Sequence, residues 1–161
     1  MTVGRNGRLD IIDHLPALRV YALSLTKSPA MADDIVQDAV IKGLSNFDKF
    51  APGSNLRAWL FTILRNCFYS ELRKFQNEFE DIDGVKAEEI EVLPDHDDRL
   101  HLNDTLLALA RLSPPLREAV WLVGVMGFSY DEAALVSGVA LGTLKSRMNR
   151  GRKALVQALR S

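Results

Sequence analysis

The chain has 161 residues, of which 47% are hydrophobic and 25% are charged, and its formal net charge is −1. This length and apolar content are enough for one medium domain or two small ones with real cores. No apolar run approaches the roughly 20 residues that a membrane helix requires, and residues 1–10 lack the apolar core of a signal peptide. We therefore expect a soluble, cytoplasmic protein without membrane insertion. The single Cys67 excludes an internal disulfide, and its apolar neighbours at helical spacing predict a buried side chain.

The near-neutral total conceals three segments of different charge. Residues 1–76 hold 10 basic and 7 acidic residues, residues 77–98 hold 1 and 10, and residues 99–161 hold 9 and 4. Two basic segments are therefore separated by a strongly acidic one, and the three parts are suited to different partners.

Residues 8–76 are predicted to form a small domain of three helices around a shared core. Apolar residues recur there at helical spacing, and no strand-like alternation persists. Ser28 followed by Pro29 is typical of a helix start, and the turn-forming residues 51–55 separate the second helix from the third. The predicted core residues are Leu15, Leu18, Ala22 and Leu25, then Ile35, Val36, Val40, Leu44 and Phe47, then Leu60, Ile63, Leu64, Cys67 and Leu72.

The segment 77–98 is rich in Glu and Asp, and its isolated apolar residues form no continuous face. This composition predicts a flexible acidic linker.

Residues 99–161 are predicted to form a second domain that contains a helix-turn-helix. Its first helix is marked by Leu102, Leu106, Leu109 and Leu112, and Ser113-Pro-Pro caps a second one. Ser129 and Glu132 then fit a capping box for a short helix that ends near Val136. The residues 137–139, with a central glycine, predict the tight turn before the last helix.

The last helix carries the stretch GTLKSRMNRGRKAL at residues 142–155, which contains five Lys or Arg residues and no acidic one. Helical spacing places Leu144, Met148, Gly151 and Leu155 on one face, which predicts packing on the preceding helices. The other faces carry Lys145, Ser146, Asn149, Arg150 and Lys153. The second helix of such a motif enters the major groove, where Arg and Asn can bind base edges in pairs of hydrogen bonds. We therefore favour a DNA-reading helix over a solvated basic face.

A second polar stripe lies on the predicted helix 56–75. Thr62, Asn66, Tyr69 and Arg73 share one face, and Arg57, Arg65 and Lys74 surround them. Hydrogen-bonding groups, an aromatic ring and peripheral cations suit single-stranded nucleic acid, because an unstacked base needs both a ring to stack on and hydrogen bonds to its edge. Alone, the stripe would be read as an ordinary polar face; beside a duplex-binding module it indicates a protein that holds double-stranded and opened DNA together.

Several motifs, in order over nearly the whole chain, resemble the extracytoplasmic-function (ECF, group IV) sigma factors of the sigma-70 family. They are DDIVQD at 33–38, LRAWLFTILRN at 56–66, FSYDEAA at 128–134 and GTLKSR at 142–147. The wording is most similar to the EcfG-type subgroup, the general-stress-response factors. The resemblance implies an all-α fold with a region 2 domain and a region 4 domain, and a promoter-specificity subunit of RNA polymerase with no cofactor and no catalysis of its own.

The resemblance also assigns contacts with core RNA polymerase, to the β′ clamp helices and the β flap. The residues that match the clamp-binding segment are Asp33, Asp34, Gln37, Asp38 and Lys42. Without the neighbouring motif, this acidic face would be read as a solvated one.

Promoter contacts follow from the same resemblance, which assigns the loop 49–55 and Asn66 to the capture of a flipped-out base of the −10 strand. The full −10 set is Lys49, Ser54, Asn55, Thr62, Arg65, Asn66, Tyr69 and Arg73. The −35 set is Thr143, Lys145, Ser146, Arg147, Asn149, Arg150 and Lys153, with Arg147 and Arg152 suited to phosphates. Trp59 is expected to belong to the core rather than to stack on a base. Val123 stands where some relatives carry an Arg, so the resemblance does not carry a −35 contact over to this position.

Further partners and rival functions remain at this point. The resemblance implies a NepR-type anti-sigma protein clamped between the domains, and a linker that either mimics nucleic acid in the polymerase or is only a tether. One alternative is a sigma-like decoy that sequesters an anti-sigma protein, and another is a one-component helix-turn-helix regulator with a ligand pocket. An enzyme is disfavoured because the sequence has no phosphate-binding loop and no nucleophile constellation. Its three histidines also show no metal-ligand spacing.

Overall fold

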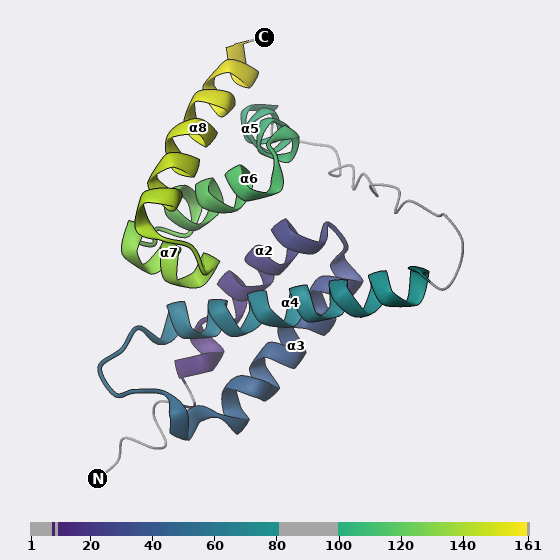
Figure 1. The fold of residues 1–161 in the computed structure, drawn as a ribbon, viewed down its shortest axis with the longest axis vertical. Helices are drawn as coiled ribbons and strands as arrows, with labels where there is room; N and C mark the ends of the chain where they lie inside the picture. The colour runs from purple at the N-terminus through teal and green to yellow at the C-terminus, as the bar shows by residue number, and fades with distance from the viewer. Residues whose placement is uncertain (1–7, 9, 81–99, 161) are drawn as a thin grey trace. The chain divides into compact units, whose positions relative to one another are not determined.

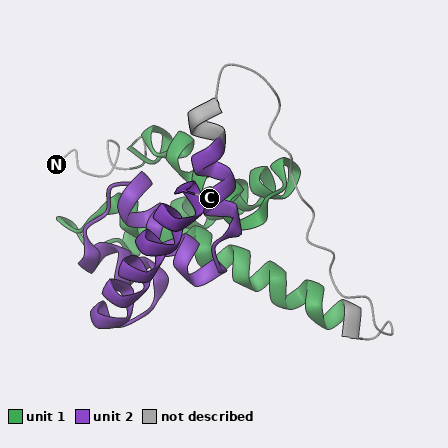
Figure 2. Ribbon diagram, turned by 90° about the horizontal axis from the view of Figure 1, so that it is seen from above, with its two compact units in different colours: residues 1–91 green, residues 92–161 purple. Residues whose placement is uncertain are grey.

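The structure, a computed structural model, describes residue 8, residues 10–80 and residues 100–160. The described residues contain helices and no strand, which confirms the predicted all-α fold class. The chain divides into two compact units, residues 1–91 and 92–161, shown in green and purple in Figure 2. Most of the predicted acidic linker, residues 81–98, lies outside the described residues.

Unit 1 is built on three helices, as predicted: α2 (Leu15–Thr26), α3 (Pro29–Ser45) and α4 (Leu56–Glu80) (Figure 1). Each of the three packs against the other two, and a short 3-10 turn, η1 (Phe47–Lys49), follows α3. A helical turn at residues 10–13 precedes α2. Helix α4 continues to Glu80, so residues 77–80, which we assigned to the linker, are helical.

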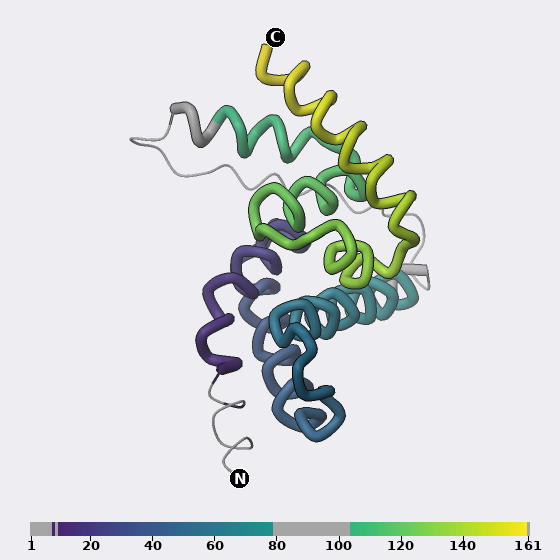
Figure 3. The backbone as a smooth tube through the Cα atoms, turned by 90° about the vertical axis from the view of Figure 1, so that its left-hand side faces the viewer, coloured from purple at the N-terminus to yellow at the C-terminus, as the bar shows by residue number. Residues whose placement is uncertain are grey.

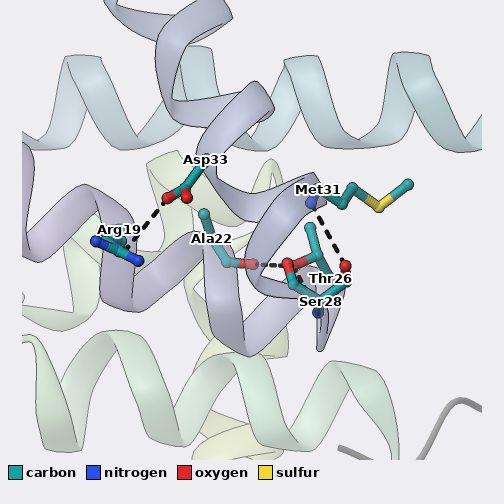
Figure 4. Close-up of polar contacts among 6 residues, drawn as sticks. All are labelled: Arg19, Ala22, Thr26, Ser28, Met31 and Asp33. Carbon is teal, nitrogen blue, oxygen red and sulfur yellow. Dashed lines mark hydrogen bonds and ion pairs between the residues drawn. The ribbon is translucent and has the colours of Figure 1, made fainter.

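Local side-chain contacts set the corner between α2 and α3 (Figure 4). Lys27 ends α2 in the left-handed conformation, with φ of 55°. The Ser28 hydroxyl caps α3 by accepting a hydrogen bond from the Met31 amide at 3.4 Å, as the Ser-Pro pair predicted. The Thr26 hydroxyl donates to the Ala22 carbonyl at 2.9 Å and accepts from the Ser28 amide at 3.3 Å. The chain therefore reverses within two residues, and α3 returns along α2.

The core of unit 1 differs in part from the predicted one. Leu18, Leu60 and Leu64 are buried as expected, and Tyr21 stacks on Phe61 with 4.8 Å between ring centroids. On α3, however, only Ile35 of the predicted apolar row is buried. The buried residues are Ala32, Ile35, Ala39 and Gly43, whereas Val36, Val40 and Phe47 are only half-buried and Leu44 is 40% exposed. Leu15, Leu25, Ile63 and Leu72 are also half-buried.

Small residues explain this rotation of α3. A Cβ at Gly43 would lie 3.1 Å from the Leu60 Cδ2 atom, so the two helices approach closely at this point. Close approach buries more of the neighbouring surface than larger side chains would allow at the same position. The row of alanines and glycine therefore faces the core, and the larger residues of the predicted row lie at its margin.

Unit 2 contains α5 (Leu100–Arg111), α6 (Pro114–Val120), a π-helical turn η2 (Trp121–Val125), α7 (Tyr130–Ser137) and α8 (Leu141–Arg160). Helix α8 packs against α5, α6 and α7. Leu109 and Leu112 are buried as predicted and Leu106 is half-buried, whereas the Leu102 side chain lies outside the described ones. Pro114 begins α6, but the predicted cap is wrong in one respect, because the Ser113 side chain makes no capping hydrogen bond.

The helix-turn-helix is formed by α7 and α8, and Figure 3 shows the chain turning sharply between them. The Ser129 hydroxyl accepts from the Glu132 amide at 3.1 Å and donates to the Glu132 carboxylate at 2.9 Å, which confirms a capping interaction between these two residues. Gly138 ends α7 in the left-handed conformation, with φ of 68°, and the Val139 amide donates to the Ala134 carbonyl at 3.1 Å. This is a Schellman-type helix end, which favours glycine.

Helix α8 is held by the face that its sequence predicted. Leu144, Met148 and Gly151 are buried and Leu155 is half-buried. Met148 belongs to an apolar cluster with Leu109, Leu112 and Val120. Because this one face is fixed in the core of unit 2, the opposite face of α8 is presented to solvent.

Candidate nucleic-acid interface

A pocket of about 260 Å³ lies in unit 1 between the end of α3, η1 and the first half of α4. Its α4 residues follow a spacing of four, three and four residues, so they form one row along the helix. The lining residues are Lys42, Asn46, Lys49, Trp59, Ile63, Asn66 and Ser70. Of the −10 set predicted from the sequence, the structure places Lys49 and Asn66 together in this pocket.

Aromatic packing fixes one wall of the pocket. Trp59 lies edge-on to Phe47, with 6.4 Å between ring centroids, and at 5.3 Å from the Phe50 ring. These contacts hold η1 and the start of the following turn against α4. Trp59 packs in this aromatic cluster, but it is only half-buried and also lines the pocket, so the structure does not place it wholly in the core as we expected.

Two amides and two ammonium groups supply the polar chemistry. The Asn46 side-chain nitrogen donates to the Lys42 carbonyl at 2.8 Å, which turns its Oδ1 atom away from that carbonyl. Asn66 is exposed, and Lys42 and Lys49 are the two charged residues among the seven that line the pocket. A ring, amide groups and cations together suit one unstacked nucleotide, because the base needs a stacking surface and edge contacts while its phosphate needs positive charge.

Asn46, Ile63 and Ser70 were missed by sequence reasoning. Helical spacing in the sequence already groups Trp59, Ile63, Asn66 and Ser70 in one row. Because Ile63 was assigned to the core, the row was not recognised as the wall of a pocket. Asn46 follows α3 directly as its C-cap, a position whose orientation depends on where the helix ends.

Lys42 of α3 is one of the residues that line the pocket. It was assigned to the polymerase-docking set, yet its side chain lines the pocket and reaches Cys67. Burial raises the pKa of the Cys67 thiol, and the nearby Lys42 ammonium opposes that rise. The thiol is therefore protonated at neutral pH and behaves as the buried apolar group that the sequence predicted.

The rest of the −10 set is not brought into the pocket. Thr62, Arg65, Tyr69 and Arg73 follow the adjacent face of α4, where the Arg65 guanidinium lies over the Tyr69 ring at 4.5 Å. Several side chains are engaged locally: Thr62 donates to the Ala58 carbonyl at 2.8 Å, Arg73 donates to Ser70 at 3.4 Å, and Asn55 caps α4 by accepting from the Ala58 amide at 3.1 Å. Ser54 is exposed in the turn 51–55. Thr62, Arg65, Tyr69 and Arg73 thus form a polar row on α4 beside the row that lines the pocket.

The outer face of α3 combines charge with apolar surface. Asp34, Gln37 and Asp38 are exposed as expected, but Asp33 forms an ion pair with Arg19 of α2 at 3.4 Å. Ile41 is 61% exposed, and it lies with Leu44 on the same face as the acidic residues. From the sequence, Ile41 was given no role and Leu44 was placed in the core. Helical spacing places Ile41 opposite the buried row of α3. A large apolar residue on the polar face of a helix was therefore the sequence signal for this surface.

The outer face of α8 is polar and basic. Thr143, Lys145, Ser146, Asn149, Arg150 and Lys153 are exposed, as is Arg152, whereas Arg147 is half-buried beside the packed face. The Arg150 guanidinium donates to the Ser146 hydroxyl at 2.9 Å. The structure thus brings the predicted −35 set together on one helix that is anchored from behind.

Two features are absent from the part of the chain that the structure describes. None of their helices is long and apolar enough to cross a membrane. They also contain no group of three or more His, Cys, Asp or Glu side chains that is arranged to hold a metal ion.

Comparison with known proteins matches both units. Residues 11–78 match the family model for sigma-70 region 2, and residues 102–155 match the model for sigma-70 region 4. The chain is 47% identical over 148 residues to the ECF RNA polymerase sigma factor EcfG of Rhodopseudomonas palustris, covering 92% of this chain and 82% of the relative. It is 35% identical to the ECF sigma factor SigE of Mycolicibacterium smegmatis, covering 85% of this chain and 56% of that relative.

A solved structure agrees with these relatives. The sigma factor RpoE of Bartonella quintana, in complex with the anti-sigma factor NepR, superposes with a TM-score of 0.85 at 45% identity and covers 97% of this chain and 98% of that one. The similarity to EcfG confirms the predicted resemblance, including its subgroup. Because both sigma-70 regions match in order and the likeness extends over nearly the whole chain, this protein belongs to the ECF family of RNA polymerase sigma factors.

Proposed function

We propose that this sigma factor docks on core RNA polymerase through α3, reads the −35 duplex with α8 and captures a base of the −10 strand in the pocket beside Asn66. The observation that supports the proposal is that one chain carries both a pocket lined by a ring, amides and ammonium groups in unit 1 and a basic, exposed helix face in unit 2. A protein that only bound duplex DNA would have no use for the first surface.

Energetics support the role of the pocket. Extruding a base from a duplex costs a few kcal/mol, and stacking on one aromatic ring returns roughly 1–3 kcal/mol per base. The Trp59 ring, the Asn66 amide and the Lys49 ammonium add three kinds of contact at one place. A pocket whose walls are already packed, as the Phe47, Phe50 and Trp59 rings are, binds with little ordering cost.

Docking on polymerase is proposed for the outer face of α3, with a changed set of residues. Asp34, Gln37 and Asp38 supply charge and hydrogen bonds, and we add Ile41 and Leu44 as apolar contacts at the centre of the same face. Exposed rim charges guide association, whereas affinity is concentrated in desolvated anchors. Lys42 is left out of this docking set, because its side chain lines the pocket and is proposed to act there.

The biological setting follows from the relatives. RpoE of B. quintana is 45% identical and is bound to NepR in its solved structure, so we propose a NepR-type anti-sigma partner for this chain. The likeness to EcfG supports the expected control of stress-response genes in the cytoplasm. We propose no catalytic activity for this chain.

Reconstituted transcription tests the proposed function. Core polymerase with this protein should start transcripts from a promoter with paired −35 and −10 elements, selected from a randomised library by the same holoenzyme. Core alone should give no such transcript. Tight binding to core without a promoter-dependent transcript would contradict the proposal and favour a sigma-like decoy, and duplex binding without core binding would favour a one-component regulator.

A single truncation tests the docking face. Ile41→Ala should weaken core binding about fivefold or more, because truncating a buried interface anchor costs upwards of ~1 kcal/mol. Ile12→Ala is the matched control, since Ile12 is 58% exposed and Ile41 is 61% exposed. Fluorescence anisotropy of labelled protein titrated with core polymerase measures both. Equal affinity of the two variants would remove Ile41 from the interface.

A further inference from the structure

One hydrogen bond joins two residues of the predicted reading set on α8. The Arg150 Nη2 atom lies 2.9 Å from the Ser146 Oγ atom, four residues earlier on the helix. Both residues are exposed. This spacing places the guanidinium over the turn that precedes it, in the N-terminal half of α8. In a helix-turn-helix, the N-terminal part of the second helix is the part that contacts base edges.

The backbone beneath this pair is fixed, so the remaining freedom is in the side chains. Leu144 and Met148 are buried on the opposite face, and Gly151 lies against α6. An arginine side chain loses much rotamer freedom when it binds, and its planar fork must be correctly oriented to meet the two acceptors of a guanine edge. A hydrogen bond that holds the fork before DNA arrives lowers this ordering cost.

The serine hydroxyl suits this task because it is neutral. It accepts a hydrogen bond from one N–H group of the guanidinium. The remaining N–H groups are sufficient for a pair of hydrogen bonds to a base. A carboxylate at the same position would also fix the side chain, but it would reduce the positive charge that attracts phosphates. The effect of Ser146 should therefore appear in sequence discrimination and not in the salt dependence of binding.

Resting on the proposed function of α8, we propose that Ser146 is a positioning residue for Arg150: it orients the guanidinium toward one guanine of the −35 element. Its contribution to specificity passes through that arginine. The chemical target is the major-groove edge of guanine, with two acceptors side by side.

A double-mutant cycle in the holoenzyme tests the inference. Core polymerase is assembled with wild-type protein, Ser146→Ala, Arg150→Ala or the double variant. Affinity is measured for the promoter selected by the wild type and for duplexes with each −35 base pair replaced in turn. Ser146→Ala should reduce discrimination about two- to tenfold at the base pair where Arg150→Ala also reduces it. The double variant should be no worse than Arg150→Ala alone.

Two controls separate positioning from direct contact or misfolding. Ser146→Thr keeps the hydroxyl and should retain discrimination, and Asn149→Ala should act at a different base pair. The slope of affinity against salt concentration should be the same for Ser146→Ala and the wild type. Additive losses, or a loss at a separate base pair, would show that Ser146 reads DNA itself and would overturn the inference. A wild type that does not discriminate among −35 variants would instead contradict the proposed function of α8.

Discussion

Asn66→Ala is expected to lower the rate of open-complex formation about tenfold to a hundredfold, while affinity for core polymerase and for the −35 duplex stays unchanged. The reason is that Asn66 is an exposed amide that lines the pocket, so its truncation should cost unit 1 little stability. Loss of paired hydrogen bonds to a base costs roughly 1–3 kcal/mol, or about fivefold to 150-fold in rate, and the expected loss lies within this range. Permanganate reactivity of unpaired thymines, followed over time in the holoenzyme, measures the opening step.

Asn77→Ala supplies the matched control for this experiment. Asn77 is exposed on the same helix, three turns beyond Asn66 and outside the pocket, so its truncation should leave strand opening unchanged. A promoter that is already mismatched across the −10 region adds a second control, because the cost of melting is removed there. The Asn66→Ala holoenzyme should bind even this promoter less tightly than the wild type does, because the variant lacks the amide that contacts the captured base. Equal loss of core binding, duplex binding and opening would indicate misfolding instead.

The sequence was sufficient to predict most of the fold. Periodicity and caps gave the helices of both units, and the face of α8 that carries Leu144, Met148 and Gly151 was predicted correctly. The failure on α3 has a physical cause. Periodicity gives most weight to large apolar residues, but apart from Ile35 the helix packs through Ala32, Ala39 and Gly43, whose small size permits close approach. A pattern that treats alanine and glycine as weakly apolar cannot detect a face that is buried because it is small.

The candidate sites were predicted less completely, because they depend on where neighbouring elements meet. Asn66 and Lys49 lie 17 positions apart in the sequence, and only the packing of η1 against Trp59 brings them into one pocket. Helical spacing alone groups Lys42 with the proposed docking residues of α3. Its side chain, however, lines the pocket. The stripe of Thr62, Tyr69 and Arg73 was predicted as a single surface with Asn66, and the structure divides it into a pocket row and an adjacent row. Sequence spacing gives the helix face but not the neighbour that covers it.

The contact between α6 and α8 gives the second large expected effect. Gly151→Ala should destabilise unit 2 by about 1–2 kcal/mol, even though alanine is the better helix former. A Cβ at this position would lie 2.7 Å from the Val120 Cγ2 atom and 3.2 Å from the Leu116 carbonyl oxygen. The second atom belongs to the backbone of α6, so relief requires the two helices to separate. Overpacking of this kind costs roughly 1–3 kcal/mol, against a gain of up to ~1 kcal/mol in helix propensity.

Gly142→Ala on the same helix separates these two terms. A Cβ at Gly142 meets no atom within 4 Å, so that substitution should stabilise α8 through propensity alone. Urea unfolding, followed by hydrogen–deuterium exchange of α8 peptides with α4 peptides as an internal reference, measures both variants. Separation of α6 from α8 would also shift the base-reading face, because Lys145, Ser146 and Arg150 are carried on the helix that must move. Gly151→Ala should therefore weaken −35 discrimination at every contacted base pair, unlike a change in any one reading residue. If both glycine substitutions raise stability equally, the close contact between α6 and α8 does not constrain the domain, and the uniform loss of discrimination should be absent as well.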